Sequence, residues 1–189
     1  MAGTAVSGRR LFYALWPDDR VRRVLARWQR DHLPPQARPT HVADLHLTLH
    51  FLGQVEEERL ESLLALGRQQ RFESFELVLD RIGHWSRPRV LWVGPSEIPE
   101  SLSRLYGGLG QGLTQLGFEL DPRPFAPHVT LARRVARLPE GLAFTPLRWQ
   151  VSEWALVESR AGERPLYHPL ECWSLDGDVG MNPDPQRGL

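Results

Sequence analysis

The sequence predicts an α+β fold with two pseudo-symmetric lobes, each a small and mostly antiparallel sheet with flanking helices, around a central cleft. The first observation is the order of segments, in which strands and helices alternate and a run of strands closes the chain. The second is the tetrapeptide His-x-Thr-Leu, which occurs at residues 46–49 and 128–131, a separation of 128 − 46 = 82 residues. A third is that 189 residues suit one domain or two tightly associated lobes.

The first half alternates strands and helices. Residues 11–16 form an apolar and aromatic run that Pro17 ends, which predicts a buried strand, and acidic residues after Pro17 favour the start of a helix. The first repeat falls in a strand over residues 45–52 that Gly53 ends. We expect the next helix over residues 55–70, because its start is acidic and leucines follow at helical spacing.

The second half begins with an expected hairpin and one helix. Residues 75–82 and 89–93 have strand character and are separated by a loop, which predicts a hairpin. Leucines at helical spacing predict a helix over residues 98–116, despite its glycines. The glycine-rich string within that helix has no clear strand before it, so we do not interpret it as a nucleotide loop. The remaining expected strands cover residues 128–135, which hold the second repeat, 148–159 and 166–175.

Composition limits both the domain organisation and the function. We expect an N-terminal tail over residues 1–9, a single bilobal domain over residues 10–176 and a flexible C-terminal tail over residues 177–189. The 23 acidic residues balance 23 basic ones, which argues against an extended groove for duplex nucleic acid. All the basic residues are arginine, so chemistry that needs a lysine nucleophile is excluded.

One cysteine, Cys172, allows no disulfide within the chain, which favours a reducing cytoplasm. No apolar run approaches the length of a membrane span, so we predict no membrane association. We also expect the protein to be a monomer.

The two repeats together indicate acid–base chemistry. A single His-x-Thr in a strand is more often a packed histidine beside a threonine whose hydroxyl is hydrogen-bonded within the protein. The occurrence of two copies favours the functional interpretation. Residues two apart in a strand share a face, so each histidine projects together with its threonine. Displacement at phosphorus needs one group that takes a proton and another that gives one, and imidazole suits both roles. Two hydroxyl donors can stabilise the non-bridging oxygens, and an arginine would add charge.

The motifs resemble those of the 2H phosphoesterases, which are named for two H-x-[ST] motifs. LHLTLHFLG at residues 45–53 and RPFAPHVTLAR at residues 123–133 are similar to the RNA 2′,3′-cyclic phosphodiesterase branch, also described as 2′-5′ RNA ligase. RLFYAL at residues 10–15, VLWVG at residues 90–94 and LVES at residues 156–159 are similar as well, so the resemblance spans about residues 10–175.

The resemblance implies hydrolysis of a terminal 2′,3′-cyclic phosphate of RNA to a 2′-phosphomonoester, without a metal or another cofactor. In this interpretation His46 is the proton donor, His128 is the proton acceptor, and Thr48, Thr130 and Arg133 bind the phosphate. The expected partners are RNA ends or short oligonucleotides that carry a cyclic phosphate. Three alternatives stay open: 2′-5′ ligation by the reverse reaction, a non-catalytic module that binds nucleotides or RNA ends, and metal-dependent hydrolysis, for which no ligand cluster is evident.

Further candidates lie beside the motifs. His50 follows Thr48 by two residues, so a regular strand predicts that it shares a face with His46, as a cleft wall or a partner for phosphate or base. For Arg123 a solvated side chain is the favoured interpretation, with substrate contact as the alternative. Four aromatic residues lie nearest the motifs and are candidates for base stacking: Phe51, Trp85, Trp92 and Phe125.

Overall fold

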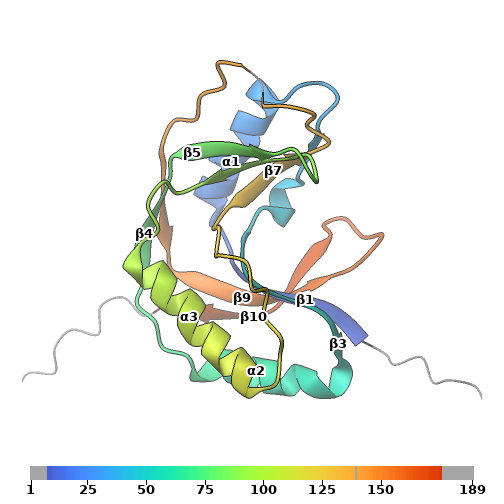
Figure 1. Cartoon of the computed structure of the whole chain (residues 1–189), viewed down its shortest axis with the longest axis vertical. Helices are drawn as coiled ribbons and strands as arrows, with labels where there is room; N and C mark the ends of the chain where they lie inside the picture. The colour runs from blue at the N-terminus through green and yellow to red at the C-terminus, as the bar shows by residue number, and fades with distance from the viewer. Residues whose placement is uncertain (1–7, 139, 176–189) are drawn as a thin grey trace, which may run out of the picture.

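The computed structural model describes residues 8–138 and 140–175, and the elements follow the predicted α+β order (Figure 1). The strands are β1 (Gly8–Leu15), β2 (Arg38–Pro39), β3 (Leu47–Glu56), β4 (Phe75–Leu79), β5 (Arg81–Trp85), β6 (Val90–Gly94), β7 (Val129–Arg133), β8 (Leu147–Val151), β9 (Glu153–Ser159) and β10 (Tyr167–Ser174). The helices are α1 (Asp19–His32), α2 (Leu60–Gln69) and α3 (Glu100–Gln115), with 3-10 turns η1 (Val42–Asp44) and η2 (Glu57–Arg59).

One eight-stranded sheet organises the described part of the chain, and a single residue pair there joins the two halves of the sheet. The strand order is β10-β9-β1-β3-β7-β6-β5, with β2 paired to β7, and every pairing is antiparallel. Among the described residues, the first half (β10, β9, β1 and β3) pairs with the second half (β7, β6, β5 and β2) only through Leu47 and Val129. The lobes predicted from the sequence therefore correspond to two halves of one sheet, each containing one His-x-Thr motif. Strands β4 and β8 form a separate two-stranded sheet.

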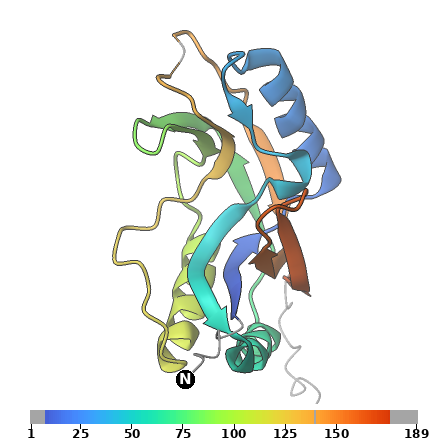
Figure 2. The same ribbon diagram turned by 90° about the vertical axis from the view of Figure 1, so that its right-hand side faces the viewer.

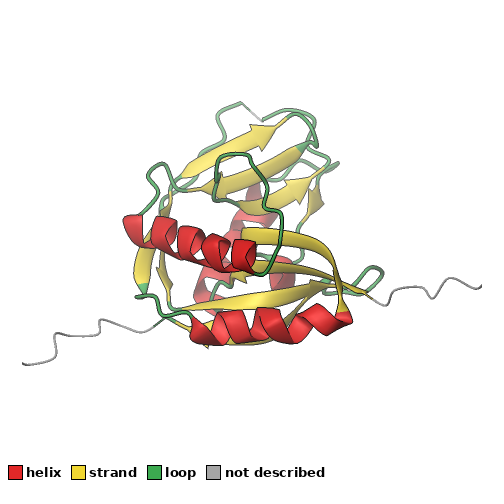
Figure 3. Ribbon diagram, turned by 60° about the horizontal axis from the view of Figure 1, so that its bottom comes forward, coloured by secondary structure: helices red, strands yellow, loops and turns green. Residues whose placement is uncertain are grey.

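The helices cover the two halves in a crossed arrangement. Helix α1 comes from the N-terminal part of the chain and packs near β7, whereas α3 comes from the C-terminal part and packs near β3. Figures 1 and 2 show α1 on the half that contains β5 and β7, away from α2 and α3. Helices α2 and α3 lie together against the other half (Figure 3). Leucines and valines of the helices and strands form one continuous core.

The start of α1 agrees with the sequence signals. Asp18 is the N-cap, and its side chain accepts a hydrogen bond from the Val21 amide at 2.8 Å. Asp19 in the first turn complements the positive end of the helix dipole. None of the helices within residues 8–138 and 140–175 has the length and apolar character needed to cross a membrane.

Three predicted elements have different boundaries in the structure, because their strands pair with distant segments of the chain. Strand β3 continues to Glu56, which pairs with Gly8, so the helix predicted from residue 55 begins at Leu60. The strand predicted over residues 75–82 is interrupted at Asp80: β4 pairs with the distant β8, and only β5 forms the hairpin with β6. The strand predicted over residues 148–159 is likewise divided at Ser152 into β8 and β9.

The predicted start of the domain, residue 10, lies within the described part of the chain. Strand β1 begins at Gly8, two residues before the predicted start of the domain. The rest of the predicted N-terminal tail and the predicted C-terminal tail, residues 177–189, lie outside the described residues.

Candidate active site

The two His-x-Thr motifs meet at the junction of the two halves of the sheet. Leu47 lies opposite Val129, and both side chains are completely buried in the core. Because side chains alternate along a strand, the neighbours of these two residues project from the other face of the sheet. We call this the histidine face, and it carries the half-buried side chains of His46, Thr48, His128 and Thr130.

Both imidazoles are oriented by the same local hydrogen bond. The Nδ1 atom of His46 lies 2.7 Å from the carbonyl oxygen of Asp44, and the Nδ1 atom of His128 lies 2.7 Å from that of Ala126. A carbonyl oxygen can only accept, so each Nδ1 carries the proton and donates it. The Nε2 atom of each ring is therefore the one that can take or give a proton, and that of His46 lies 3.1 Å from Thr48 Oγ1.

A β-bulge follows the first motif. Thr48 pairs with Ala14, whereas His50 pairs with Tyr13, so Leu49 is an extra residue in β3. Tyr13 is part of the main core, and Leu49 and His50 are 5% and 4% exposed. Two consecutive side chains of β3 therefore face the core, which a regular strand does not permit.

The bulge returns Phe51 to the histidine face. Phe51 pairs with Phe12, whose ring centroid lies 4.9 Å from that of His46. Directly opposed residues of antiparallel strands share a face, so Phe51 lies on the same side as the histidine. Its side chain is 49% exposed, and the guanidinium of Arg10 lies 4.7 Å from the ring centroid.

The second motif repeats this arrangement. Thr130 pairs with Trp92, and the register then shifts by one residue at Leu131. Leu131 and Ala132 are both completely buried, after which Arg133 is exposed on the histidine face. In each motif the bulge thus brings the side chain five residues after the histidine to the same face as the histidine and threonine.

His46 lies among aromatic rings. Its ring centroid is 4.9 Å from that of Phe12, 4.8 Å from Tyr167 and 6.1 Å from Trp16, which is stacked on it. Burial lowers the pKa of His46 to about 4, although the hydrogen bond to the Asp44 carbonyl opposes that shift. The Asp44 side chain accepts a hydrogen bond from the Tyr167 amide at 3.0 Å, so Asp44 positions both rings.

His128 has fewer aromatic neighbours and a cationic one. Trp85 meets its ring edge-on, with centroids 4.5 Å apart, and Trp92 lies at 6.2 Å. Burial lowers the pKa of His128, the hydrogen bond to the Ala126 carbonyl opposes this, and the positive charge of Arg133 lowers the pKa further. Two of the aromatic residues predicted to lie near the site, Trp85 and Trp92, are therefore in contact with a motif histidine.

Arg22 supports the His46 side of the site from within the protein. Its Nε donates to the Pro17 carbonyl at 2.8 Å and its Nη1 donates to the Val42 carbonyl at 2.6 Å. The guanidinium also lies 4.7 Å from the ring of Trp16, which is stacked on His46. Arg22 therefore joins the segment after β1 to the 3-10 turn that precedes the first motif.

The comparison with known proteins agrees with this geometry. The sequence model of the 2′-5′ RNA ligase superfamily matches residues 17–163. The chain belongs to this superfamily. The RNA 2′,3′-cyclic phosphodiesterase of Escherichia coli is 36% identical over 173 residues, which cover 88% of this chain and 97% of that protein. The protein of the same name from Thermus thermophilus is 39% identical over 185 residues, covering 90% of this chain and 92% of that protein.

A solved structure of a superfamily member shows the same fold. The crystal structure of E. coli LigT complexed with 3′-AMP is similar with a TM-score of 0.78 at 34% sequence identity. The similarity covers 89% of this chain and 99% of that chain. The predicted resemblance to the 2H phosphoesterases and the predicted α+β class are thus confirmed.

The predicted position of His50 is wrong. The bulge at Leu49 turns His50 away from the histidine face and toward α3, where its Nε2 donates to the Tyr106 carbonyl at 2.8 Å. Its ring stacks on that of Tyr106 at 4.1 Å, and Tyr106 stacks on Phe125 at 3.9 Å. This three-ring stack connects β3, α3 and the loop before His128, so Phe125 takes part in packing between these elements.

Arg123 forms an ion pair with Asp121, and both side chains are exposed. It makes no hydrogen bond to either motif among the described residues. Within residues 8–138 and 140–175, no three His, Cys, Asp or Glu side chains are grouped so that they could hold a metal ion.

Proposed function

We propose that this protein hydrolyses the terminal 2′,3′-cyclic phosphate of RNA to a 2′-phosphomonoester, with two histidines and without a metal ion. The observation that carries this proposal is the pair of His-x-Thr motifs at the Leu47–Val129 junction, each with its imidazole Nδ1 held by a backbone carbonyl. The Nε2 atoms are therefore available for proton transfer on the same face of the sheet. The names of the E. coli and T. thermophilus relatives support this activity.

In the proposed reaction, His128 Nε2 accepts a proton from water as the water oxygen attacks phosphorus. The bond between phosphorus and the 3′-oxygen breaks, and His46 Nε2 gives its proton to that oxygen. The electron pair of the broken bond stays on the 3′-oxygen, and the phosphate stays on the 2′-oxygen. Thr48 and Thr130 donate hydrogen bonds to the non-bridging oxygens, and Arg133 stabilises their charge.

The electrostatics of the site make substrate binding and protonation cooperative. Burial lowers the pKa of both histidines, so His46 and His128 are neutral in the free protein near pH 7. A cyclic phosphate carries a negative charge, which favours a protonated imidazole beside it. Binding of the substrate therefore raises the pKa of His46 and supplies the protonated donor that the reaction requires.

Phe51 is the proposed base platform of the site. It is the large exposed aromatic side chain on the histidine face beside Phe12, and a base stacked on such a ring gains about 1–3 kcal/mol. Trp85 and Trp92 occupy the corresponding side of His128 and offer further aromatic surface. An RNA end with at least one base is therefore a better substrate in this proposal than a bare cyclic phosphodiester.

The decisive assay incubates the purified protein with an RNA oligonucleotide that ends in a 2′,3′-cyclic phosphate, in the presence of EDTA. We expect a 2′-phosphate product, identified by its resistance to a 3′-specific phosphatase, at the same rate as without EDTA. A 3′-phosphate product would contradict the proposed bond cleavage, and loss of activity with EDTA would favour metal-dependent hydrolysis. Adding an RNA with a 5′-hydroxyl end tests 2′-5′ joining in the same mixture, because that hydroxyl then takes the place of water in the attack on phosphorus.

A protein that binds the oligonucleotide but leaves it intact would instead be a binding module. The cytoplasmic location and the monomeric state stay predictions from the sequence.

A further inference from the structure

The balanced net charge conceals a strong local asymmetry. Residues 33–43, 81–96 and 124–138 contain one, three and three arginines, seven in all, and no aspartate or glutamate. These segments contribute β2, β5, β6 and β7, which together form the second half of the sheet. The seven side chains are all exposed: Arg38, Arg81, Arg87, Arg89, Arg133, Arg134 and Arg137.

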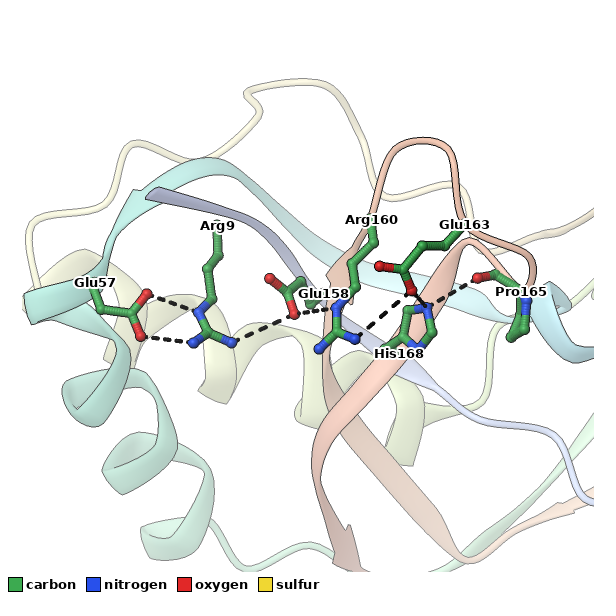
Figure 4. Close-up of polar contacts among 7 residues, drawn as sticks. All are labelled: Arg9, Glu57, Glu158, Arg160, Glu163, Pro165 and His168. Carbon is green, nitrogen blue, oxygen red and sulfur yellow. Dashed lines mark hydrogen bonds and ion pairs between the residues drawn. The ribbon is translucent and has the colours of Figure 1, made fainter. Parts of the chain in front are cut away.

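The first half of the sheet shows a different pattern, because carboxylates pair with Arg9 of β1 and with Arg160 directly after β9. Arg10 of β1 instead lies 4.7 Å from the centroid of the Phe51 ring. Arg9 pairs with Glu57 and Glu158, and Arg160 pairs with Glu158 and Glu163, so the charges form one continuous network (Figure 4). Within the described part of the chain, none of the seven arginines of the second half has a carboxylate oxygen within 4.0 Å. The second half is thus a concentrated region of uncompensated positive charge.

Two of these arginines are directly opposed. Arg38 of β2 pairs with Arg133 of β7, so the two side chains share the histidine face on neighbouring strands. Like charges placed directly opposite each other destabilise a sheet. An anion between or beside the two guanidinium groups removes that repulsion. The paired N–H donors of a planar guanidinium also match the geometry of the oxygen atoms of a phosphate. The pair also extends the positive charge away from Thr130, along the sheet and beyond the reacting phosphate.

Two more arginines have strained backbones beside this pair. Arg89 has φ 63° and Arg134 has φ 61°, in the left-handed region that is unfavourable for residues with a side chain. They lie at the β6 and β7 ends where Val90 pairs with Arg133, and the Val135 amide donates to the Arg89 carbonyl at 3.2 Å. Such a conformation costs free energy and persists where the surrounding structure holds it, as it often does at functional sites. It places further arginines at the end of β7, adjacent to the opposed pair.

We propose that the arginine surface formed by Arg38, Arg87, Arg89 and Arg134, beside the phosphate-binding Arg133, binds the phosphodiester backbone of the single-stranded RNA that ends in the cyclic phosphate. This inference rests on the proposed function. The reacting phosphate belongs to the terminal nucleotide, so the nucleotides that precede it are the ones able to reach arginines adjacent in the sheet. Binding releases counterions from each neutralised phosphate, which makes the contribution strongly dependent on salt. The substrate is then a strand of several nucleotides and not a mononucleotide.

The test compares two substrates in a triple variant, Arg38→Gln, Arg87→Gln and Arg89→Gln. An oligonucleotide of about ten nucleotides with a cyclic phosphate end should lose roughly tenfold in kcat/KM at low salt, and adenosine 2′,3′-cyclic phosphate should lose less than about twofold. The salt dependence of kcat/KM for the oligonucleotide should become shallower by about 0.7 per lost contact on a double logarithmic plot. The matched control removes equal charge elsewhere, by Arg71→Gln, Arg104→Gln and Arg148→Gln, and should leave both substrates unchanged.

A binding measurement separates failure of this inference from failure of the proposed function. Fluorescence anisotropy with a 3′-phosphate-ended oligonucleotide needs no turnover, so it applies even if the wild type cleaves neither substrate. Weaker binding by the triple variant than by the control variant supports the arginine surface. Equal binding by the two variants overturns it, as does an equal loss of kcat/KM on both substrates. Tighter binding of an RNA duplex than of the single strand also overturns it.

Discussion

The two His-x-Thr motifs have the same backbone geometry but different surroundings. Each has a histidine held by the carbonyl two residues earlier, a threonine on the same face and a bulge directly after it. His46, however, lies among Phe12, Trp16 and Tyr167, whereas His128 lies beside Trp85 and Trp92 and near Arg133. Similar backbone geometry therefore gives two histidines with different electrostatic environments.

The difference continues beyond the bulges. The fifth residue after the histidine is Phe51 in the first motif and Arg133 in the second, and both lie on the histidine face. An aromatic ring suits a base, and a guanidinium suits a phosphate. In the proposed function, the same motif and bulge therefore present a residue for the base in the first half of the sheet and a residue for the phosphate in the second half. We call these the base side and the phosphate side. Each part of this division can be tested by substitution.

The largest expected effect follows removal of either imidazole. His46→Ala and His128→Ala should each lower kcat by about 10²–10⁴-fold, because proton transfer then depends on water. The double variant should be little worse than either single variant, since acid and base act in one step. Single-turnover rates on an RNA cyclic phosphate measure this. His168→Ala is the control: His168 bonds to the Pro165 carbonyl and Glu163 in a hairpin, and its loss should leave the rate unchanged.

The next effect separates the two residues that follow the bulges. Arg133→Gln should lower kcat by about 10²-fold, because charge on the transferring phosphate is less stabilised. Phe51→Leu should raise KM for an oligonucleotide by about fivefold or more with kcat nearly unchanged, because base stacking is lost. Leu138→Ala, at another exposed apolar residue, should change neither constant. If both variants changed kcat and KM in the same proportion, the division between base side and phosphate side would be untenable.

The motifs and their chemistry were predictable from the sequence, and the bulges were not. Alternation correctly placed each histidine with its threonine, because the spacing is two and the strand is regular there. Beyond Thr48 the same rule gave the wrong face for His50, because a bulge depends on the pairing with β1 and leaves no signal in β3 alone. Arg133 was identified by resemblance, whereas regular alternation from His128 would have placed it on the core face.

Nonlocal pairing also explains what the sequence analysis missed. Phe12 and Trp16 both lie in the predicted first strand, but their contact with His46 depends on β1 pairing beside β3. Tyr167 reaches His46 from the last strand, through a hydrogen bond to Asp44. Arg22 is one of many arginines, and burial alone distinguishes it. The alternation of Phe12, Ala14 and Trp16 was the one available signal, since it marks one face of that strand.

The two histidines should also titrate differently in the free protein. By NMR, His46 should titrate near pH 4, and His128 should titrate below its ordinary value, because burial disfavours the imidazolium of each. Arg133→Gln should raise the pKa of His128, since it removes a positive neighbour, and should affect His46 less. A bound phosphate monoanion should raise the pKa values of both histidines. The alkaline limb of the pH profile of kcat, which reports the enzyme–substrate complex, should therefore lie at higher pH than the alkaline limb of kcat/KM, which reports the free enzyme. Unperturbed titration of both rings would contradict the buried environments.

The smallest effect on activity should come from His50, the histidine that the bulge removes from the histidine face. His50→Gln should lower the free energy of unfolding by about 1–3 kcal/mol, since it leaves the Tyr106–Phe125 stack incomplete, yet change kcat/KM by less than about threefold. Burial lowers the pKa of His50, so its protonation favours the unfolded chain, and wild-type stability should fall as pH drops below about 6.5.

The His50→Gln variant should lose part of this pH dependence of stability. Urea denaturation of the wild type and the variant at pH 7.5 and pH 5.5 would measure it. Tyr106→Leu should have a similar effect, and the double variant should lose less stability than the sum of the two, because the rings are in direct contact. A raised KM for RNA with unchanged stability in His50→Gln would instead place this side chain among the substrate contacts, and would require that the bulge at Leu49 be absent when RNA is bound.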